Sequence, residues 1–289
     1  MKTWFITGAS RGLGARIARH ALAGGDAVVA TARNAKAATE SLGEHPRLLV
    51  LTLDVTDEAQ AKVAAAAAVE RFGRIDVLLN NAGYGLLGAV EEAADAEVEA
   101  LYRTNVFGLL TVTRAVLPHL RAQRAGRILN LSSIGGYRAG AGFGVYCSTK
   151  FAVEGLSEAL HAELAPLGIH VTAVEPGYFR TDFLDAASLA VSGASITDYN
   201  TTAGAARSRA AGLNHDQPGD PDRLAAALVA FADAPDPPVR LPLGSDTVAA
   251  IEAKLASDAA ILATWRSVSV STDFAAAAPV RAAGETPSA

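Results

Sequence analysis

The 289-residue sequence contains a single cysteine, Cys147, so one chain cannot close an internal disulfide. Its N-terminus enters an apolar, strand-like run without the charged, apolar and small-residue regions of a signal peptide, and we predict a cytoplasmic protein. Six histidines, which include His119, His161 and His170, show no spacing typical of metal ligands. Cys147 has no histidine beside it in a nucleophile-like arrangement, so we predict neither a metal site nor a cysteine nucleophile.

Long uncharged apolar runs are also missing. The alanine-rich stretch at 64–69 is closed by Glu70 and Arg71, far short of the roughly 18 to 20 residues that a membrane span needs. The formal charge is −5, with acids and bases scattered, so no basic stripe suits a phosphodiester backbone. The sequence therefore predicts that neither a membrane nor a nucleic acid is a partner.

Apolar residues make up 50% of the chain, which is enough for one large core. Short runs rich in Val, Ile and Leu alternate with longer helix-like segments, a pattern that predicts parallel strands covered by helices on both faces. The expected strands are 3–7, 27–31, 48–53, 77–79, 128–131 and 169–174, and the expected helices are 13–23, 57–72, 96–121, 146–167, 222–233 and 245–266. The predicted fold is α/β, a single doubly wound parallel sheet in a three-layer sandwich.

One catalytic domain is expected over residues 1–266. Residues 177–221 lose strong periodicity and are rich in Gly, Ser, Thr and Asp, which indicates a mobile substrate-binding lid. Residues 267–289 contain few large apolar side chains, so this C-terminal tail either frays or packs on a neighbouring subunit. Trp265 and Phe274 are interpreted as core or interface anchors rather than as a site.

A glycine-rich turn joins the first strand to the first helix, in the stretch Thr7-Gly8-Ala9-Ser10-Arg11-Gly12-Leu13-Gly14. Gly8 permits a tight turn, Gly12 lets the backbone approach a pyrophosphate, and Gly14 allows the helix to pack closely on the strand. The helix N-terminus adds free N–H donors. We therefore expect a dinucleotide to bind here, although a purely structural turn is the alternative.

Five ordered segments carry a resemblance to a known family. They are the turn at 7–14, Asp54-Val55 after the third strand, Asn80-Asn81-Ala82-Gly83 after the fourth, Tyr146-Cys147-Ser148-Thr149-Lys150, and Pro176-Gly177 through to Thr181. Over about residues 3–265 the chain resembles the short-chain dehydrogenase/reductase family. The resemblance implies further cofactor contacts: Asp54 and Val55 near adenine; Asn81, Ala82 and Gly83; and Pro176, Gly177 and Thr181 near nicotinamide. Asn80 is expected to brace the sheet.

Tyr146 and Lys150 lie four residues apart at the start of a predicted helix, and so share one face. An adjacent ammonium and a positive nicotinamide ring both favour the phenolate, so we expect a lowered tyrosine pKa and proton transfer near neutral pH. The resemblance implies that Lys150 also holds the ribose and that Asn105 holds a water linking Lys150 to solvent. Ser133 can polarise the substrate oxygen; Ser132 competes for this role, and only the family spacing favours Ser133.

Charge at the end of the second predicted strand indicates the cofactor. The position that resembles the family's acidic residue, which would bind the ribose hydroxyls of NAD, is Ala32, and its neighbour is Arg33. Arg11 in the glycine turn can approach the same 2′-phosphate from the other side. These residues predict NADP(H) over NAD(H), with solvated surface charge as the alternative.

The expected activity is hydride transfer between NADP(H) and a ketone or secondary alcohol, as in the carbonyl, hydroxysteroid and retinol enzymes that residues 176–183 resemble. Two alternatives differ in specific residues. A nucleotide-sugar epimerase or dehydratase uses a similar tyrosine and lysine but a different glycine spacing, and a non-catalytic NADP sensor would lack the catalytic side chains. The family resemblance also implies a homodimer or homotetramer built by the fourth and fifth helices.

Overall fold

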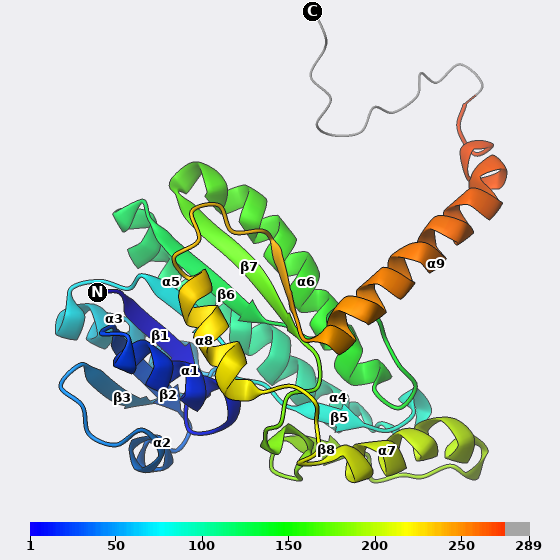
Figure 1. Ribbon diagram of the computed structural model, residues 1–289, viewed down its shortest axis with the longest axis horizontal. Coiled ribbons are helices and arrows are strands. Elements are labelled where there is room, and N and C mark those ends of the chain that lie inside the picture. Colours follow the sequence, from blue (N-terminus) through cyan, green and yellow to red (C-terminus); the bar gives the residue numbers. More distant parts are fainter. Residues whose placement is uncertain (275–289) are drawn as a thin grey trace, which may run out of the picture.

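The computed structural model describes residues 1–274, and a seven-stranded parallel sheet forms its centre (Figure 1). Its strands are β1 (Thr3–Thr7), β2 (Ala27–Ala32), β3 (Leu48–Thr52), β4 (Val77–Asn80), β6 (Gly126–Leu131), β7 (Ile169–Pro176) and β9 (Arg240–Leu243). They lie in the order β3-β2-β1-β4-β6-β7-β9, so the winding direction reverses beside β1 and β4. The predicted doubly wound α/β fold is confirmed, and such a reversal opens a crevice at the carboxyl ends of the strands.

Helices cover both faces of the sheet because successive strand side chains point in opposite directions. Trp4 and Ile6 pack with α1 (Gly12–Ala23) and α8 (Pro221–Phe231) on one face. Phe5, between them, packs into the opposite layer, which is formed by α3 (Glu58–Phe72), α5 (Leu109–Gln123) and α6 (Gly144–Leu164). The near-continuous apolar strands therefore build two cores, one on each side.

One prediction about local structure was wrong, and one strand of the sheet was missed. The single helix expected over 96–121 is α4 (Asp95–Tyr102), a π-helical turn at Arg103–Gly108, and α5. Apolar periodicity does not register the extra residue that a π turn inserts. Strand β9 was missed because Pro242 removes a backbone donor and argues against a strand, yet this strand lies at the edge of the sheet, where a proline is tolerated.

Several short elements were also missed. Helix α2 (Ala35–Leu42) has only eight residues, although Asn34 caps it by accepting from the backbone N–H of Ala37. Residues 177–221 are not irregular throughout, because they contain β8 (Leu189–Val191), α7 (Ala205–Leu213) and short turns at Asp182–Leu184, Thr197–Tyr199 and Asn200–Gly204. Strand β8 pairs with β5 (Gly85–Leu87) in a separate two-stranded sheet.

Buried polar contacts fasten this segment to the body of the protein. The Glu92 carboxylate, 2% exposed, accepts from the backbone N–H groups of Ala89 and Ile196, both at 2.7 Å, and pairs with Arg207 of α7. Three donors on one buried carboxylate fix α7 and the turn before it. The segment 177–221 is thus a structured cover; whether it moves stays a prediction.

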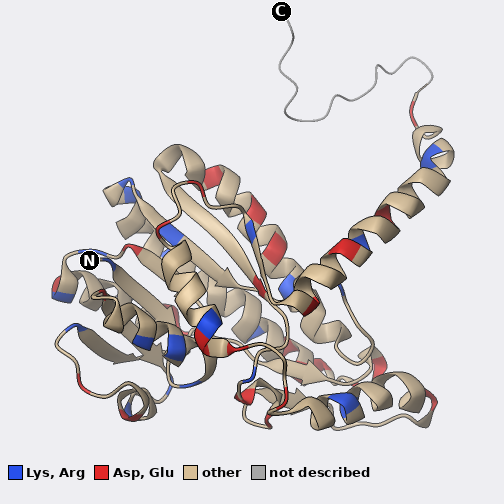
Figure 2. Cartoon of the chain, in the orientation of Figure 1, with Lys and Arg blue, Asp and Glu red and all other residues tan. Residues whose placement is uncertain are grey.

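The long helix α9 (Ser245–Val270) extends away from the rest of the chain (Figure 1). Trp265 is 58% exposed and Phe274 92% exposed, so neither is a core anchor of this chain. The helix also runs four residues past the predicted boundary at 266, and the rest of the expected tail, 275–289, lies outside the described residues. None of the helices within residues 1–274 is long and apolar enough to span a membrane. Figure 2 shows acidic and basic residues distributed over most of the helices and loops, with several acidic residues in succession on α6.

Candidate active site

A large cavity of about 1330 Å³ lies at the carboxyl edge of the sheet. It is lined by residues that follow β1, β2, β3, β4, β6 and β7, and it is bordered by residues of the 177–221 segment. Most of the predicted site residues line it: Gly8, Ser10, Arg11, Gly12, Leu13, Arg33, Asp54, Val55, Asn81, Ala82, Gly83, Ser133, Tyr146, Lys150, Pro176, Gly177 and Thr181. Gly14 and Asn105 lie behind this lining layer.

The glycine turn has the geometry that the sequence pattern requires. Gly8 and Gly12 have φ values of +67° and +59°, in the left-handed region that favours glycine. A Cβ on Gly12 would meet no atom within 4 Å, so the turn leaves open space above its backbone. A Cβ on Gly14 would lie 2.6 Å from the Gly8 carbonyl oxygen. The turn therefore fits a pyrophosphate lying against bare backbone at the start of α1.

Asn81 supports this turn from behind. Its Nδ2 donates to the carbonyl oxygens of Thr7, at 2.8 Å, and Gly8, at 3.0 Å. The Thr7 hydroxyl in turn accepts from the backbone N–H groups of Asn81 and Ala82. The Nδ2 group of Asn81 is thus occupied in holding the turn, and Asn81, Ala82 and Gly83 all line the cavity. Asn80 donates to Thr113 and Asn130, both at 2.9 Å, and braces the sheet as expected.

Ala32, the last residue of β2, and Arg33 border the cavity together with Asp54. Asp54 accepts from the backbone N–H of Thr56 at 2.9 Å, and this hydrogen bond is the main cause of its lowered pKa, with a smaller contribution from the charge of Arg33. Arg11 points elsewhere than expected, because its guanidinium donates to the carbonyl oxygen of Ala187 in the cover segment. Of the two arginines expected to bind a 2′-phosphate, Arg33 therefore remains the better placed.

Pro176, Gly177 and Thr181 lie at the far end of the cavity. Thr181 caps the turn Asp182–Leu184, where its hydroxyl accepts from the backbone N–H of Phe183 at 3.3 Å. Asp246, at the start of α9, also lines the cavity, and no motif in the sequence indicated it. Its carboxylate accepts from the backbone N–H of Tyr178 at 2.8 Å, and only glycine at 177 leaves room for it.

Tyr146, Lys150 and Ser133 lie together in the lining of the cavity. Tyr146 is 7% exposed and lies between Phe143 and Phe183, with ring centroids 6.2 and 5.8 Å away. The Lys150 Nζ lies 5.8 Å from the centroid of the Tyr146 ring and donates to the carbonyl oxygen of Leu131 at 2.7 Å. α6 begins at Gly144, so both side chains project from its first two turns as the four-residue spacing predicts.

The structure separates the two competing serines. Ser133 lies near Tyr146. A Cβ built on Gly135 would lie 3.4 Å from the Ser133 Oγ and 3.5 Å from the Tyr146 Cε1, so both side chains border the same point. Ser132 is 3% exposed and lies on the opposite side, where a Cβ on Gly136 would meet its Oγ and the Glu154 side chain. Geometry therefore favours Ser133 as the neighbour of the phenol.

Asn105 lies in the π-helical turn and is buried. Its Oδ1 accepts from the backbone N–H of Tyr84 at 3.1 Å, and its Nδ2 donates to the Tyr84 carbonyl at 2.9 Å and to Thr149 at 3.2 Å. The extra residue of the π turn aims this side chain at the strand-end loop and at α6 together. Asn105 thus joins the loop that carries Gly83 to the helix that carries Lys150.

Burial controls the protonation of both central groups. Burial raises the pKa of Tyr146, although its hydrogen bond with Ser133 opposes the rise. Burial also lowers the pKa of Lys150 to about 8, an effect that the negative charge of Glu154 opposes. The direction for Tyr146 is opposite to the one expected from the Tyr-Lys spacing, because removing the phenolate from water outweighs an ammonium that lies beside the ring.

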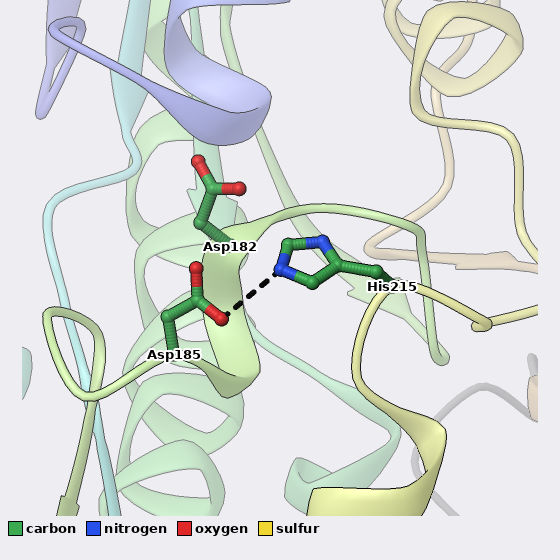
Figure 3. Close-up of side chains that lie close together, drawn as sticks. All are labelled: Asp182, Asp185 and His215. Atoms are coloured by element: carbon green, nitrogen blue, oxygen red, sulfur yellow. Dashed lines mark ion pairs between the residues drawn. The ribbon is translucent and has the colours of Figure 1, made fainter.

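Asp182, Asp185 and His215 form a small cluster at the border of the cavity that sequence spacing did not reveal (Figure 3). Their ligand-type atoms lie within 4.8 Å of one another, and the His215 Nε2 lies 3.2 Å from an Asp185 oxygen. Asp182 and His215 are exposed, so water competes for both. The ion pair joins the turn after β7 to the loop after α7, two ends of the cover segment.

Comparisons with known proteins agree with this architecture. A family model described as "short chain dehydrogenase" matches residues 2–191. Oxidoreductase BOA17 of Botryotinia fuckeliana is 39% identical over 275 residues, covering 93% of this chain and 98% of that protein. A 3-ketodihydrosphingosine reductase of Bacteroides thetaiotaomicron is 42% identical over 180 residues, covering 62% of this chain and 65% of that protein.

Solved structures show the same likeness. A short-chain dehydrogenase from Streptomyces avermitilis superposes with a TM-score of 0.87 at 42% identity, covering 94% of this chain and 99% of that one. Actinorhodin polyketide ketoreductase with NADPH superposes with a TM-score of 0.71 at 29% identity, covering 85% and 97% of the two chains. A 3-ketoacyl-(acyl-carrier-protein) reductase from Brucella melitensis with NADH gives 0.70 at 27%, covering 84% and 96%. By sequence, fold and the five ordered motifs, this chain belongs to the short-chain dehydrogenase family of oxidoreductases.

Proposed function

We propose that this oxidoreductase interconverts a ketone and a secondary alcohol with NADP(H), with Tyr146 as the proton donor and acceptor. The observation that carries the proposal is the meeting of Tyr146, Lys150 and Ser133 in one cavity with the bare-backbone glycine turn. A bound nicotinamide supplies or accepts the hydride. All four proposed catalytic side chains are present, which disfavours the sensor alternative, and the spacing of Gly8, Gly12 and Gly14 disfavours the nucleotide-sugar enzymes.

In the reductive direction, Tyr146 protonates the carbonyl oxygen while Ser133 donates a hydrogen bond that orients it. A raised phenol pKa suits a proton donor, because it keeps the proton on Tyr146 until negative charge develops on the substrate oxygen. In the oxidative direction, proton loss from Tyr146 depends on Lys150 and on the positive charge at the nicotinamide end of the bound dinucleotide. Asn105 holds the loop of Gly83 against α6, and so positions Lys150 for the ribose hydroxyls.

The substrate end of the cavity favours an apolar ketone. Phe143, Tyr178, Phe183 and Leu184 line the cavity, and the charged side chains of Arg138, Asp182 and Arg209 line it too. A relative named as a 3-ketodihydrosphingosine reductase and a structural neighbour named as a polyketide ketoreductase support a carbonyl substrate of this kind. A panel of ketones, steroids, retinoids and sugar alcohols, followed by NADPH absorbance, together with sugar nucleotides, followed by product analysis, tests the proposal. Turnover of sugar nucleotides but of no ketone would overturn it.

NADP(H) is proposed because Ala32 cannot repel a 2′-phosphate and Arg33 can bind it. The structural neighbours include complexes with NADP⁺, NADPH, NADH and NAD, so they support a nicotinamide dinucleotide without selecting one. With Arg11 turned towards Ala187, one charge-assisted contact of about 1.5–3 kcal/mol remains, which corresponds to a preference of roughly tenfold to a hundredfold in kcat/KM.

Cofactor choice is tested with Arg33→Ala, which should remove most of this preference, and with Ala32→Asp combined with Arg33→Ala, which should reverse it. Arg19→Ala is the control, because this arginine bonds to Ser41 on the outer side of α1 and does not line the cavity. Equal kcat/KM for the two cofactors in the unmodified enzyme would contradict this assignment of Arg33.

We also propose a homodimer or homotetramer, a cytoplasmic location, and one catalytic domain with residues 177–221 as its lid. Phe107 before α5 and Phe151 on α6 are 57% and 46% exposed, which supports association through these helices, and Trp265 offers a further contact on α9. The lone, buried Cys147 suits a reducing compartment. Light scattering on the full chain and on Phe107→Ser tests the association.

A further inference from the structure

Two buried carboxyl groups lie behind the catalytic lysine. Glu154 follows Lys150 by one turn of α6, and Glu175 lies on β7 immediately before Pro176. Both glutamates are almost fully buried, at 2% and 1% exposed. Neither lines the large cavity, so neither is accounted for by the proposed reaction.

Arg240 of β9 is the cation that both carboxyl groups approach. Its Nε lies 3.2 Å from a Glu154 oxygen and 3.8 Å from a Glu175 oxygen. The same guanidinium pairs with Glu158 on the surface of α6, at 2.8 Å, and lies over the Tyr137 ring, 5.2 Å from its centroid. One positive charge therefore serves three carboxyl groups, two of them removed from water.

The carboxylate oxygens of Glu154 and Glu175 also have too few hydrogen-bond donors. Within residues 1–274, all four side-chain oxygens of Glu154 and Glu175 are buried without a well-formed hydrogen bond, and so is the Ser132 hydroxyl beside Glu154. Two ionised carboxylates can only accept, so they cannot satisfy each other. A single proton between them turns one into a donor and removes one buried charge, which is the usual solution for adjacent carboxyl groups.

We propose that Glu154 and Glu175 share one proton, and that the single negative charge they retain keeps the buried Lys150 side chain in its ammonium form. Glu154 and Glu175 are thus positioning residues that act through Lys150. The functional consequence rests on the proposed role of Lys150, whereas the charge balance itself does not.

The surroundings of Lys150 make such a counter-charge necessary. Lys150 is 7% exposed, and its ammonium donates to the neutral carbonyl oxygen of Leu131. The Tyr146 phenol is neutral, and the loop side offers the amide of Asn105 near Gly83. Burial lowers the pKa of Lys150 to about 8, and the charge of Glu154 opposes this. Burial and the charge of Glu154 raise the pKa of Glu175 well above its usual range, as expected for a pair holding one proton.

The other polar groups around the two glutamates do not supply the negative charge that the Lys150 ammonium needs. Arg240, Glu158 and Tyr137 face it from β9, the outer side of α6 and the loop after β6, and Ser132 from the end of β6. Asp246 of α9 lies against Gly177, where its carboxylate accepts from the backbone N–H of Tyr178. Glu154 of the pair is therefore the carboxyl group whose charge acts on Lys150.

The test uses the full chain labelled with ¹³C at the lysine side chains. The sequence has five lysines, so the spectrum is simple, and Lys150→Arg assigns the signal. Each single variant, Glu154→Gln or Glu175→Gln, retains one carboxyl group that ionises and supplies the same charge. Both should leave the Lys150 titration near pH 8, whereas the double variant should lower its midpoint by about one pH unit.

Glu158→Gln is the matched control, because it removes a carboxylate on Arg240 at the surface and should not move Lys150. If a single variant lowers the midpoint of the Lys150 titration as far as the double variant does, both carboxyl groups are ionised in the parent. If the double variant leaves this midpoint unchanged, the pair does not act on Lys150. Either result overturns the proposal. If the double variant does not fold, both single variants must still match the parent titration and must lose the pH dependence of stability described below.

A second measurement separates this inference from the proposed function. The Kd for NADPH, followed by fluorescence, should weaken about tenfold in the double variant near pH 8, and Glu158→Gln should match the parent. If the double variant has the same Lys150 titration as the parent and the parent enzyme reduces ketones, the inference is overturned and the proposed function is left intact. The expected titrations in a protein that reduces no ketone would overturn the function and leave the charge balance intact.

Discussion

Gly14→Ala tests whether the glycine turn depends on close contact rather than on backbone freedom. A methyl group at this position would lie 2.5 Å from the Asn81 Nδ2 and 2.6 Å from the Gly8 carbonyl oxygen. Neither neighbour can yield independently, because the Asn81 Nδ2 donates to this same carbonyl and to that of Thr7. The carbonyl has to retreat by about 0.8 Å to reach the 3.4 Å of ordinary contact.

Overpacking of this kind costs about 1–3 kcal/mol of unfolding free energy. The displaced backbone is also the surface on which the pyrophosphate would lie, so the Kd for NADPH should rise by about tenfold or more, equivalent to roughly 1.4 kcal/mol. Urea unfolding followed by circular dichroism measures the stability, and fluorescence titration with NADPH measures the binding.

Two other glycines serve as controls for Gly14→Ala. Gly155 lies in the exposed part of α6, where an added methyl group would meet no atom within 4 Å, so Gly155→Ala should stabilise the protein by about 0.5–1 kcal/mol without changing the Kd. Gly12 has φ +59° and open space, so Gly12→Ala should cost about 1–2 kcal/mol through backbone strain alone. If Gly14→Ala unfolds at the same urea concentration as the parent, the contact argument is wrong.

Three further predictions concern the reaction, the cover and the buried acids. Tyr146→Phe should lower kcat by about 10²- to 10⁴-fold in steady-state assays. The NADPH Kd should stay within about twofold, because the volume of the ring is kept. A variant that retains more than a tenth of the parent kcat would show that Tyr146 is not the proton donor. Hydrogen exchange across residues 178–220 should slow when NADP(H) is added, and unchanged protection would count against a closing lid. In the free protein, Glu92→Gln should speed this exchange, because it weakens the bond to Arg207. Because burial and the charge of Glu154 raise the pKa of Glu175 in the folded state, the folded protein holds the proton more tightly than the unfolded chain, and stability should fall as the pH rises above about 4.5, the ordinary pKa of a glutamate. Glu175→Gln should flatten this urea-unfolding profile, and a parent profile that is already flat would contradict the shared proton.

Local patterns in the sequence were enough to predict the sheet, most of its covering helices and the order of the site segments. Val- and Ile-rich runs form buried strands, and the Gly8, Gly12 and Gly14 pattern permits one kind of turn. The four-residue spacing of Tyr146 and Lys150 fixes a shared helix face whatever the surroundings. Parallel strands then bring the carboxyl ends of distant segments to one edge, which explains why nearly all the predicted site residues line one cavity.

Contacts between segments far apart in the chain govern the features that these patterns missed. The direction of the Tyr146 pKa is set by burial between Phe143 and Phe183, and Arg11 turns to Ala187 because the cover segment lies across the turn. The same holds for the acids behind the lysine, where Glu154, Glu175 and Arg240 come from three elements, one of them a proline-containing edge strand that local propensity does not reveal. Desolvation and charge balance are sums over neighbours in space, so no periodicity along the chain encodes them.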